Sequence, residues 1–430
     1  MMKLAFRAVC NPTAATLIMK SLLTLALLIL GVMNVSGAPS ASFAEFDRKA
    51  RAHEPLSVVF FGGSLTFGAN ASNPEITSWR GLMMTYLQQK YPGTPFKFRD
   101  AAIGGTGSDL GMFRLQRDVL ANKPDLVFYD FTVNDGADGA DIEKLASYEG
   151  ILRKMIGAGI PVVQEFFTFK FYRAPEAYKL QRYLDHKKLA EAYHTGTGDV
   201  MASVCELVHS GKVPENDIWP ADMAHPYDYG YTLFFDAVRD GFEKAIADGR
   251  VCVVPEKPVF SDKFNQVTRT VLVDGTLPKG WRRATAYRTA LWYDGLPSRW
   301  MTDMAVAGGK AKDQKKAVTD IEPLKVEFTG TFVGIFGEKA GNGLSFKVKI
   351  DGKSVPYVVE DKREGTSITF DAWPNNTARF APDKSSHLFS WISISNHLAP
   401  GKHTLEIEPV LNPDNPDGEL HIESVCTAGE

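Results

Sequence analysis

The sequence contains few cysteines and no strong excess of charge. Four cysteines in 430 residues exclude a small scaffold built on disulfide bonds. A formal net charge of −3 argues against a general nucleic-acid binder, since binding to phosphate backbones depends on a basic surface. Internal repeats and low-complexity tracts are absent. Hydrophobic residues make up 44% of the chain and charged residues 23%, which indicates folded domains, about two or three of them at this length.

The N-terminal region departs from this average composition. Residues 1–38 contain three basic residues and no acidic one, an apolar run of only about ten residues at 21–30, and the small residues Ser36, Gly37 and Ala38. This pattern predicts a secretory signal peptide and therefore a secreted or periplasmic protein. The alternative is a retained anchor, for which the apolar run is short, because a spanning helix needs about 20 apolar residues.

Removal of this segment would change the formal net charge from −3 to −6, because three basic residues are lost. It would also remove Cys10 and leave Cys205, Cys252 and Cys426. An odd number of cysteines in an exported protein allows at most one intramolecular disulfide bond here. We expect Cys252 and Cys426 to pair, because they stand where the chain enters and leaves the second domain described below.

Strand-like and helix-like patterns alternate through residues 55–250. Short apolar runs predict strands at 56–61, 96–103, 125–131 and 161–167. Helical periodicity occupies the intervals, at 78–89, 110–122, 142–158, 175–193, 200–210 and 229–248. This alternation predicts an α/β domain whose parallel sheet has helices on both faces. Ligands bind such sheets beyond the carboxyl ends of the strands.

The pattern becomes that of an all-β domain after a proline-punctuated linker. Residues 325–336 and 345–350 alternate apolar and polar side chains, and residues 403–408 and 419–425 suggest a closing hairpin. We therefore predict a jelly-roll-like β-sandwich. The full organisation is a signal peptide at 1–38, an α/β domain at 39–250, a linker at 251–262 and the β-sandwich domain at 263–430.

Ser64 has the position of a nucleophile. It follows a buried strand and the pair Gly62-Gly63, so a tight turn would expose its hydroxyl at the carboxyl edge of the sheet. By itself this motif is weak, since many such turns are only turns. Two further strand ends supply candidate donors for an oxyanion, namely the Gly105 backbone N–H and the Asn134 amide, with the Ser64 N–H as a third. The alternatives are a tight connection at Gly105 and an Asx turn at Asn134.

Asp222 and His225 stand three residues apart in the segment Trp219-Pro-Ala-Asp-Met-Ala-His-Pro. On one turn, the carboxylate can hold one imidazole nitrogen while the other nitrogen faces the Ser64 hydroxyl, as in a Ser-His-Asp triad. The alternatives are a surface ion pair and a metal site. A metal site is disfavoured, because further ligands at a suitable spacing are lacking.

In this order, Gly-Gly-Ser-Leu-Thr, Gly-Gly-Thr-Gly-Ser, Val-Asn-Asp and Asp-x-x-His-Pro resemble the four blocks of the SGNH (GDSL-type) hydrolase superfamily. The resemblance covers about 45% of the chain. It implies a flavodoxin-like three-layer α/β/α fold, with Ser64 as nucleophile, Gly105 and Asn134 in the oxyanion hole, and Asp222 and His225 as orienter and base. Two departures are Gly63 where many members have Asp, and Thr132 where glycine is common.

The resemblance implies a secreted serine esterase that removes acetyl groups from carbohydrate. The substrate would be an acetylated polysaccharide or oligosaccharide, and no cofactor, metal, nucleic acid or stable membrane insertion is expected. Two other functions remain open: a lipid esterase, lysophospholipase or thioesterase of the same superfamily, and a non-catalytic glycan-binding protein.

Aromatic residues suggest further contacts with substrate. Trp79 and Arg80 follow the nucleophile closely and either line its pocket or begin the first helix of the α/β domain. Five tryptophans of the second domain either stack on sugar rings or fill the sandwich core: Trp281, Trp292, Trp300, Trp373 and Trp391.

Overall fold

We describe the fold from a computed structural model of the chain. The residues that the structure describes are 40–139, 141–285, 303–310, 316–361, 365–375 and 387–429. Within them, none of the helices has an apolar stretch that would reach across a bilayer. Trp292, Trp300 and the predicted signal peptide lie outside the described residues.

The α/β domain is built on a five-stranded sheet in which every described pair of strands is parallel. The strand order is β3-β2-β4-β5-β6. The second strand along the chain, β3, thus lies at the edge of the sheet and the first, β2, lies inside it, as in flavodoxin-like folds. The prediction of a flavodoxin-like sheet is confirmed. The bounds are β2 Leu56–Phe61, β3 Phe96–Asp100, β4 Leu126–Tyr129, β5 Val162–Glu165 and β6 Gly196–Gly198.

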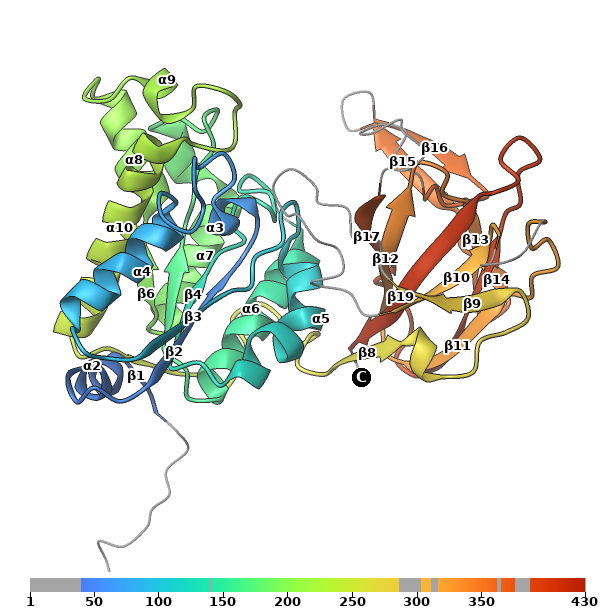
Figure 1. Ribbon diagram of the computed structural model, residues 1–430, viewed down its shortest axis with the longest axis horizontal. Helices are drawn as coiled ribbons and strands as arrows, with labels where there is room; N and C mark the ends of the chain where they lie inside the picture. The colour runs from blue at the N-terminus through green and yellow to red at the C-terminus, as the bar shows by residue number, and fades with distance from the viewer. Residues whose placement is uncertain are drawn as a thin grey trace, which may run out of the picture. The chain divides into compact units, whose positions relative to one another are not determined.

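Helices cover both faces of this sheet and complete the three layers (Figure 1). On one side, α10 packs against α2, α4 and α8, and on the other side α6 packs against α5 and α7. The bounds are α2 Phe43–Arg51, α4 Trp79–Lys90, α5 Ser108–Asp118, α6 Ile142–Gly157, α7 Gln181–Ala192, α8 Val200–His209 and α10 Asp228–Ala247. Short helices α3 Ser64–Phe67 and α9 Glu215–Ile218 lie in the loops, and β1 Ala41–Ser42 pairs with β7 Val251–Cys252.

Side-chain caps determine where several of these helices begin. The Ser78 hydroxyl accepts a hydrogen bond from Gly81 N at the start of α4. Asp141 caps α6 through Glu143 N, and Asp199 caps α8 through Ala202 N. Each cap satisfies a backbone N–H that has no partner within its own helix, which stabilises the helix by about 1 kcal/mol.

Trp79 is the centre of the core beneath the end of β2. Its side chain is fully buried and meets Phe60, Phe128 and Phe167 at ring-centroid distances of 5.6, 6.1 and 5.4 Å. Its Nε1 donates to the Leu65 carbonyl at 2.9 Å. Of the two roles that the sequence allows for Trp79, a pocket wall or the start of a helix, the structure has the second: Trp79 begins α4 and holds α3 against the sheet.

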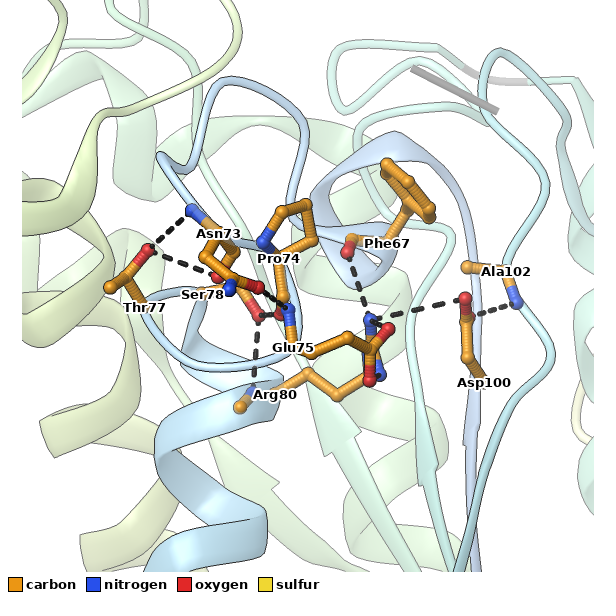
Figure 2. Close-up of polar contacts among 10 residues, drawn as sticks. Phe67, Asn73, Pro74, Glu75, Thr77, Ser78, Arg80, Asp100 and Ala102 are labelled. Atoms are coloured by element: carbon orange, nitrogen blue, oxygen red, sulfur yellow. Dashed lines mark hydrogen bonds and ion pairs between the residues drawn. The ribbon is translucent and has the colours of Figure 1, made fainter. Parts of the chain in front are cut away.

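Arg80 is buried beside it and binds three structural elements at once (Figure 2). Its guanidinium donates to the Phe67 carbonyl at 3.3 Å and to Glu75 Oε1 at 2.8 Å, and lies 3.9 Å from Asp100 Oδ2. Asp100 in turn accepts from Ala102 N at 2.9 Å. A buried guanidinium with these partners supports the loops after β2 and β3 rather than lining a pocket.

The second domain contains two antiparallel sheets, which confirms the predicted β-sandwich. One has the order β17-β12-β19-β10-β9, with β8 also paired to β19, and the other has the order β11-β18-β13-β14. Their inner faces share one hydrophobic core, which includes Val333 and Ile422 from the first sheet and Val348 and Leu405 from the second. A separate hairpin is formed by β15 Tyr357–Asp361 and β16 Thr366–Phe370.

The predicted closing hairpin of this domain is wrong. β18 pairs with β11 and β13, whereas β19 lies in the other sheet between β12 and β10. The bounds are β8 Val267–Val271, β9 Trp281–Ala284, β10 Met304–Gly308, β11 Leu324–Thr329, β12 Phe332–Ala340, β13 Phe346–Ile350, β14 Lys353–Ser354, β17 His387–Ser395, β18 Lys402–Pro409 and β19 Glu419–Ala428.

The predicted disulfide bond is also wrong. Cys205, Cys252 and Cys426 are buried free thiols. Cys252 lies in β7, which pairs with the N-terminal strand of the α/β domain, whereas Cys426 lies within β19 of the β-sandwich. Burial raises the pKa of the Cys252 thiol to about 11 and that of Cys426 to about 12, so both stay protonated at neutral pH.

Two of the tryptophans in the second domain fill its core. Trp281 and Trp373 are each 8% exposed, and each donates its Nε1 to a backbone carbonyl. Trp391 is half-buried, and its Nε1 donates to Asp109 Oδ2 at 3.0 Å. These three side chains therefore pack within the protein and do not present an open ring face on which a sugar could stack.

Replacing Trp79 with alanine should lower the free energy of unfolding by about 3–5 kcal/mol, because a large buried side chain and its hydrogen bond are lost. Urea denaturation followed by circular dichroism measures this change. Ile76→Ala is the control, since Ile76 is 60% exposed in the preceding loop, and we expect a change within about 0.5 kcal/mol. Equal effects of the two substitutions would contradict the core role of Trp79.

Candidate active site

Ser64 is the first residue of α3. Only Gly62 and Gly63 separate it from the last residue of β2. The Asn134 side chain packs so closely on Gly63 that any Cβ there would overlap it. A side chain at position 63 would therefore displace the Asn134 amide. Ser64 is 6% exposed, and its hydroxyl points out of the sheet edge toward the loop before α10.

That loop delivers Asp222 and His225 between α9 and α10. Asp222 Oδ1 accepts from the backbone N–H groups of Ala224 and His225 at 2.7 and 2.6 Å, which folds the segment into a turn around the carboxylate. Asp222 Oδ2 lies 3.0 Å from His225 Nδ1, and His225 Nε2 lies 2.9 Å from Ser64 Oγ. The three side chains thus form one hydrogen-bonded chain with the geometry of a Ser-His-Asp triad.

The Asp222 carboxylate is stabilised in its charged form. Partial burial raises its pKa, but the hydrogen bonds from the backbone N–H groups of His225 and Ala224, together with the His225 side chain, outweigh this effect. The pKa therefore lies below the ordinary value, and the carboxylate stays ionised as the pH falls through the mildly acidic range. An ionised Asp222 can orient the imidazole and stabilise the imidazolium.

The ends of β3 and β4 lie beside this chain. Ile103 N donates to the Gly62 carbonyl at 3.1 Å and Asp130 N to the Phe61 carbonyl at 3.0 Å, which fixes the loops after both strands next to the Ser64 turn. Gly105 follows Ile103 in an exposed tight turn with φ +71°, a left-handed conformation that suits glycine. Its backbone N–H belongs to the loop adjoining Ser64.

Asn134 lies against the Ser64 turn through its side-chain amide. Its Oδ1 is buried and accepts no hydrogen bond within the described part of the chain. An Asx turn would use this oxygen as an acceptor from the backbone two residues on, so the structure does not use Asn134 in that way. The amide is instead held at the sheet edge, next to the nucleophile.

Asp135, which sequence reasoning did not select, joins the second and third loops. Its Oδ1 accepts from Ser108 N at 2.8 Å, at the start of α5. Burial raises its pKa to about 7, and nearby Lys144 opposes this increase. Two other carboxyl groups, Asp130 and Glu165, are buried at the ends of β4 and β5, and burial raises their pKa well above the ordinary range. Asp130 Oδ1 accepts a hydrogen bond from Thr132 N at 3.0 Å in the loop after β4.

No cluster of three or more His, Cys, Asp or Glu side chains suited to a metal ion occurs among the described residues. The chemistry that the site itself offers is nucleophilic: a serine hydroxyl, a base in hydrogen-bond contact with it, and a carboxylate that orients the base.

Comparison with known proteins places these features in a family. Residues 60–233 match the model of the GDSL-like Lipase/Acylhydrolase family. No curated protein sequence matches the chain significantly. The matched segment includes Ser64, Gly105, Asn134, Asp222 and His225.

Two solved structures match nearly the whole chain, and a third matches less than half of it. The chain is similar to a two-domain esterase active on acetylated mannans, co-crystallised with mannopentaose, at 19% identity over 91% of this chain and 97% of that chain, with a TM-score of 0.68. A second structure of such a two-domain esterase gives 20% identity over 90% and 94%, with a TM-score of 0.67. An acetylxylan esterase from Geobacillus stearothermophilus shares 21% identity over 44% of this chain and 94% of its own, with a TM-score of 0.36.

The family match includes the strand end that carries Ser64 and the loop that carries Asp222 and His225. The two-domain esterase matches this chain across both of its domains. Over residues 60–233 the α/β domain therefore resembles the GDSL-like lipases and acylhydrolases of the SGNH type, and the chain is a carboxylic ester hydrolase.

Proposed function

We propose that the chain is an exported esterase that removes acetyl groups from a polysaccharide through an acyl-enzyme on Ser64. The observation that carries the mechanism is the position of His225, 2.9 Å from Ser64 Oγ and 3.0 Å from Asp222 Oδ2. The proposal of a carbohydrate substrate starts from the two-domain fold shared with the mannan esterase. The proposal of export rests on the composition of residues 1–38.

In the acylation step, His225 Nε2 takes the proton of the Ser64 hydroxyl as Oγ attacks the ester carbonyl carbon. The carbonyl oxygen becomes an oxyanion, to which the backbone N–H groups of Ser64 and Gly105 and the Asn134 amide donate. Asp222 stabilises the imidazolium through Nδ1. The tetrahedral intermediate collapses, and the sugar alcohol leaves with the proton from His225.

Deacylation repeats these steps with water in place of the sugar alcohol. His225 accepts a proton from water as the water oxygen attacks the acetyl-serine carbonyl, and the same donors hold the second oxyanion. Collapse releases acetic acid and returns the proton to Ser64.

Purified protein should release acetate from at least one of a panel of acetylated xylan, mannan, pectin and alginate, and Ser64→Ala should abolish the release. Ser203→Ala is the matched control, because Ser203 is exposed on α8 and its hydroxyl bonds only to the local helix backbone. If Ser64→Ala is as active as the unmodified protein, the serine mechanism is excluded. If acetate is released from none of the four polysaccharides, the substrate proposal fails.

A series of p-nitrophenyl esters separates acetylesterase from lipid esterase activity. We expect the highest kcat/KM with the acetyl ester and a steady fall as the acyl chain lengthens. A maximum with long acyl chains would support the lipid esterase alternative and contradict the acetylesterase proposal.

Replacing Asn134 with alanine should lower kcat by about 10²–10³-fold with little change in KM, because one donor to the oxyanion is lost and the donor acts mainly in the transition state. Steady-state kinetics with p-nitrophenyl acetate measures both constants. Asn122→Ala is the control, since the Asn122 amide donates to the Asp118 carbonyl on a helix end away from Ser64. A rise in KM at constant kcat would show that Asn134 binds substrate instead.

A further inference from the structure

Asn70 lies in the loop between α3 and α4 and reaches the turn that carries Asp222 and His225. Its Nδ2 donates to Asp222 Oδ2 at 2.8 Å and to the His225 backbone carbonyl at 3.3 Å. The backbone of Asn70 has φ +67°, in the left-handed region that few residues other than glycine, asparagine and aspartate adopt. The side chain that bonds the triad carboxylate is thus held in an uncommon backbone conformation.

We propose that Asn70 is a positioning residue that fixes the Asp222 carboxylate, and through it the His225 imidazole, for proton transfer with Ser64. This proposal rests on the function proposed above. Asn70 contacts neither Ser64 nor the reacting atoms in the structure, so its effect passes through Asp222.

The hydrogen bonds to Asp222 show why a fourth donor matters. Oδ1 is held by the backbone N–H groups of Ala224 and His225, whereas Oδ2 is shared by His225 Nδ1 and Asn70 Nδ2. The Asp222 side chain is 38% exposed. Without Asn70, water would compete for Oδ2, and the carboxylate would be held against rotation only by the two backbone bonds to Oδ1 and by His225 itself. The second bond of Asn70, to the His225 carbonyl, ties both ends of the Asp–His turn to one amide.

The loop that presents Asn70 is anchored on either side of it. On one side, the Tyr231 hydroxyl of α10 donates to the Ala69 carbonyl at 2.7 Å. On the other side, Asp228 at the start of α10 accepts from Ser72 N at 2.8 Å and from the Thr77 hydroxyl at 2.8 Å. The loop therefore moves with the start of α10, which is the element that follows His225.

Contacts within the loop make it rigid (Figure 2). Thr77 Oγ1 accepts a hydrogen bond from Asn73 N at 3.1 Å, and the Ser78 hydroxyl donates to the Pro74 carbonyl. Glu75 is bound by the buried Arg80 guanidinium. A rigid support is what a positioning residue requires, because small displacements of a catalytic group are costly.

The test compares Asn70→Gly and Asn70→Asp with the unmodified protein. Asn70→Gly keeps the left-handed backbone without strain and removes the amide. We expect kcat for p-nitrophenyl acetate to fall roughly 10- to 100-fold, with KM changed less than about threefold. The low-field proton resonance of the His225–Asp222 hydrogen bond, observed by NMR, should shift or broaden.

Asn70→Asp preserves size and backbone tolerance but replaces the donor with a carboxylate, which repels Asp222 at about pH 8. It should lose at least as much kcat as Asn70→Gly. Lys123→Gly is the control, because Lys123 also has a left-handed backbone, φ +46°, in an exposed turn before β4. It should retain the kcat and the resonance of the unmodified protein.

The proposal is overturned if both Asn70 variants keep the kcat and the low-field resonance of the unmodified protein. It is also overturned if the loss of activity equals the loss of active enzyme measured by burst titration while the low-field resonance is unchanged. In that case the variant enzyme that remains active works normally. Ser64→Ala is run in parallel: if it remains active, the proposed mechanism fails whatever Asn70 does, whereas an inactive Ser64→Ala beside fully active Asn70 variants removes only the role of Asn70.

Discussion

The hydrogen bond between Ser64 Oγ and His225 Nε2 joins residues 161 positions apart, at the two ends of the α/β domain. The sheet places Ser64 at the carboxyl edge of β2, and the start of α10 places His225 opposite it. Each partner is fixed locally, Ser64 by a glycine turn beneath Asn134 and His225 by the folding of its loop around the Asp222 carboxylate. The proposed chemistry depends on these two local structures meeting with correct geometry.

The surroundings of this hydrogen bond contain several costly polar groups. Arg80 is buried with acidic and carbonyl partners around it, and Asp130 and Glu165 are buried with pKa values raised by desolvation. Burying such groups costs free energy that an apolar core would not. Arg80 donates to the Phe67 carbonyl in α3 and lies near Asp100 at the end of β3, and Asp130 accepts from Thr132 N in the loop that carries Asn134.

Much of the fold could be predicted because local pattern and tertiary structure agree. β2 is a continuous apolar run that is buried on both faces, and its observed bounds equal the predicted ones. The strand β6 could not be predicted because Gly-Thr-Gly has no strand signature. Its Gly198 lies so close to α10 that a Cβ there would stand 2.9 Å from Val238 Cα. The hairpin of β18 and β19 was predicted wrongly because alternation identifies strands and not their partners.

In the candidate site, too, some residues could be predicted from the sequence and others could not. Motif spacing along the chain was enough to select Ser64, Asp222 and His225 as candidates, since each stands at a strand end or on one short turn. Asn70 could not be selected, because its contact with Asp222 spans 152 residues and its sequence context is that of an ordinary loop. Trp79 was ambiguous for a similar reason: an aromatic residue after a nucleophile suits a pocket wall as well as a core, and only its neighbours Phe60, Phe128 and Phe167 decide.

The proposed reaction depends on an acetyl group bound covalently to Ser64. The most direct measurement is to mix the enzyme with an acetyl ester, quench with acid during turnover, digest the protein and map the acetylated peptide by mass spectrometry. The account predicts acetylation of Ser64, and its accumulation should rise when deacylation is slowed. Turnover with no acetyl group on Ser64, or acetylation of another residue in its place, would contradict the account.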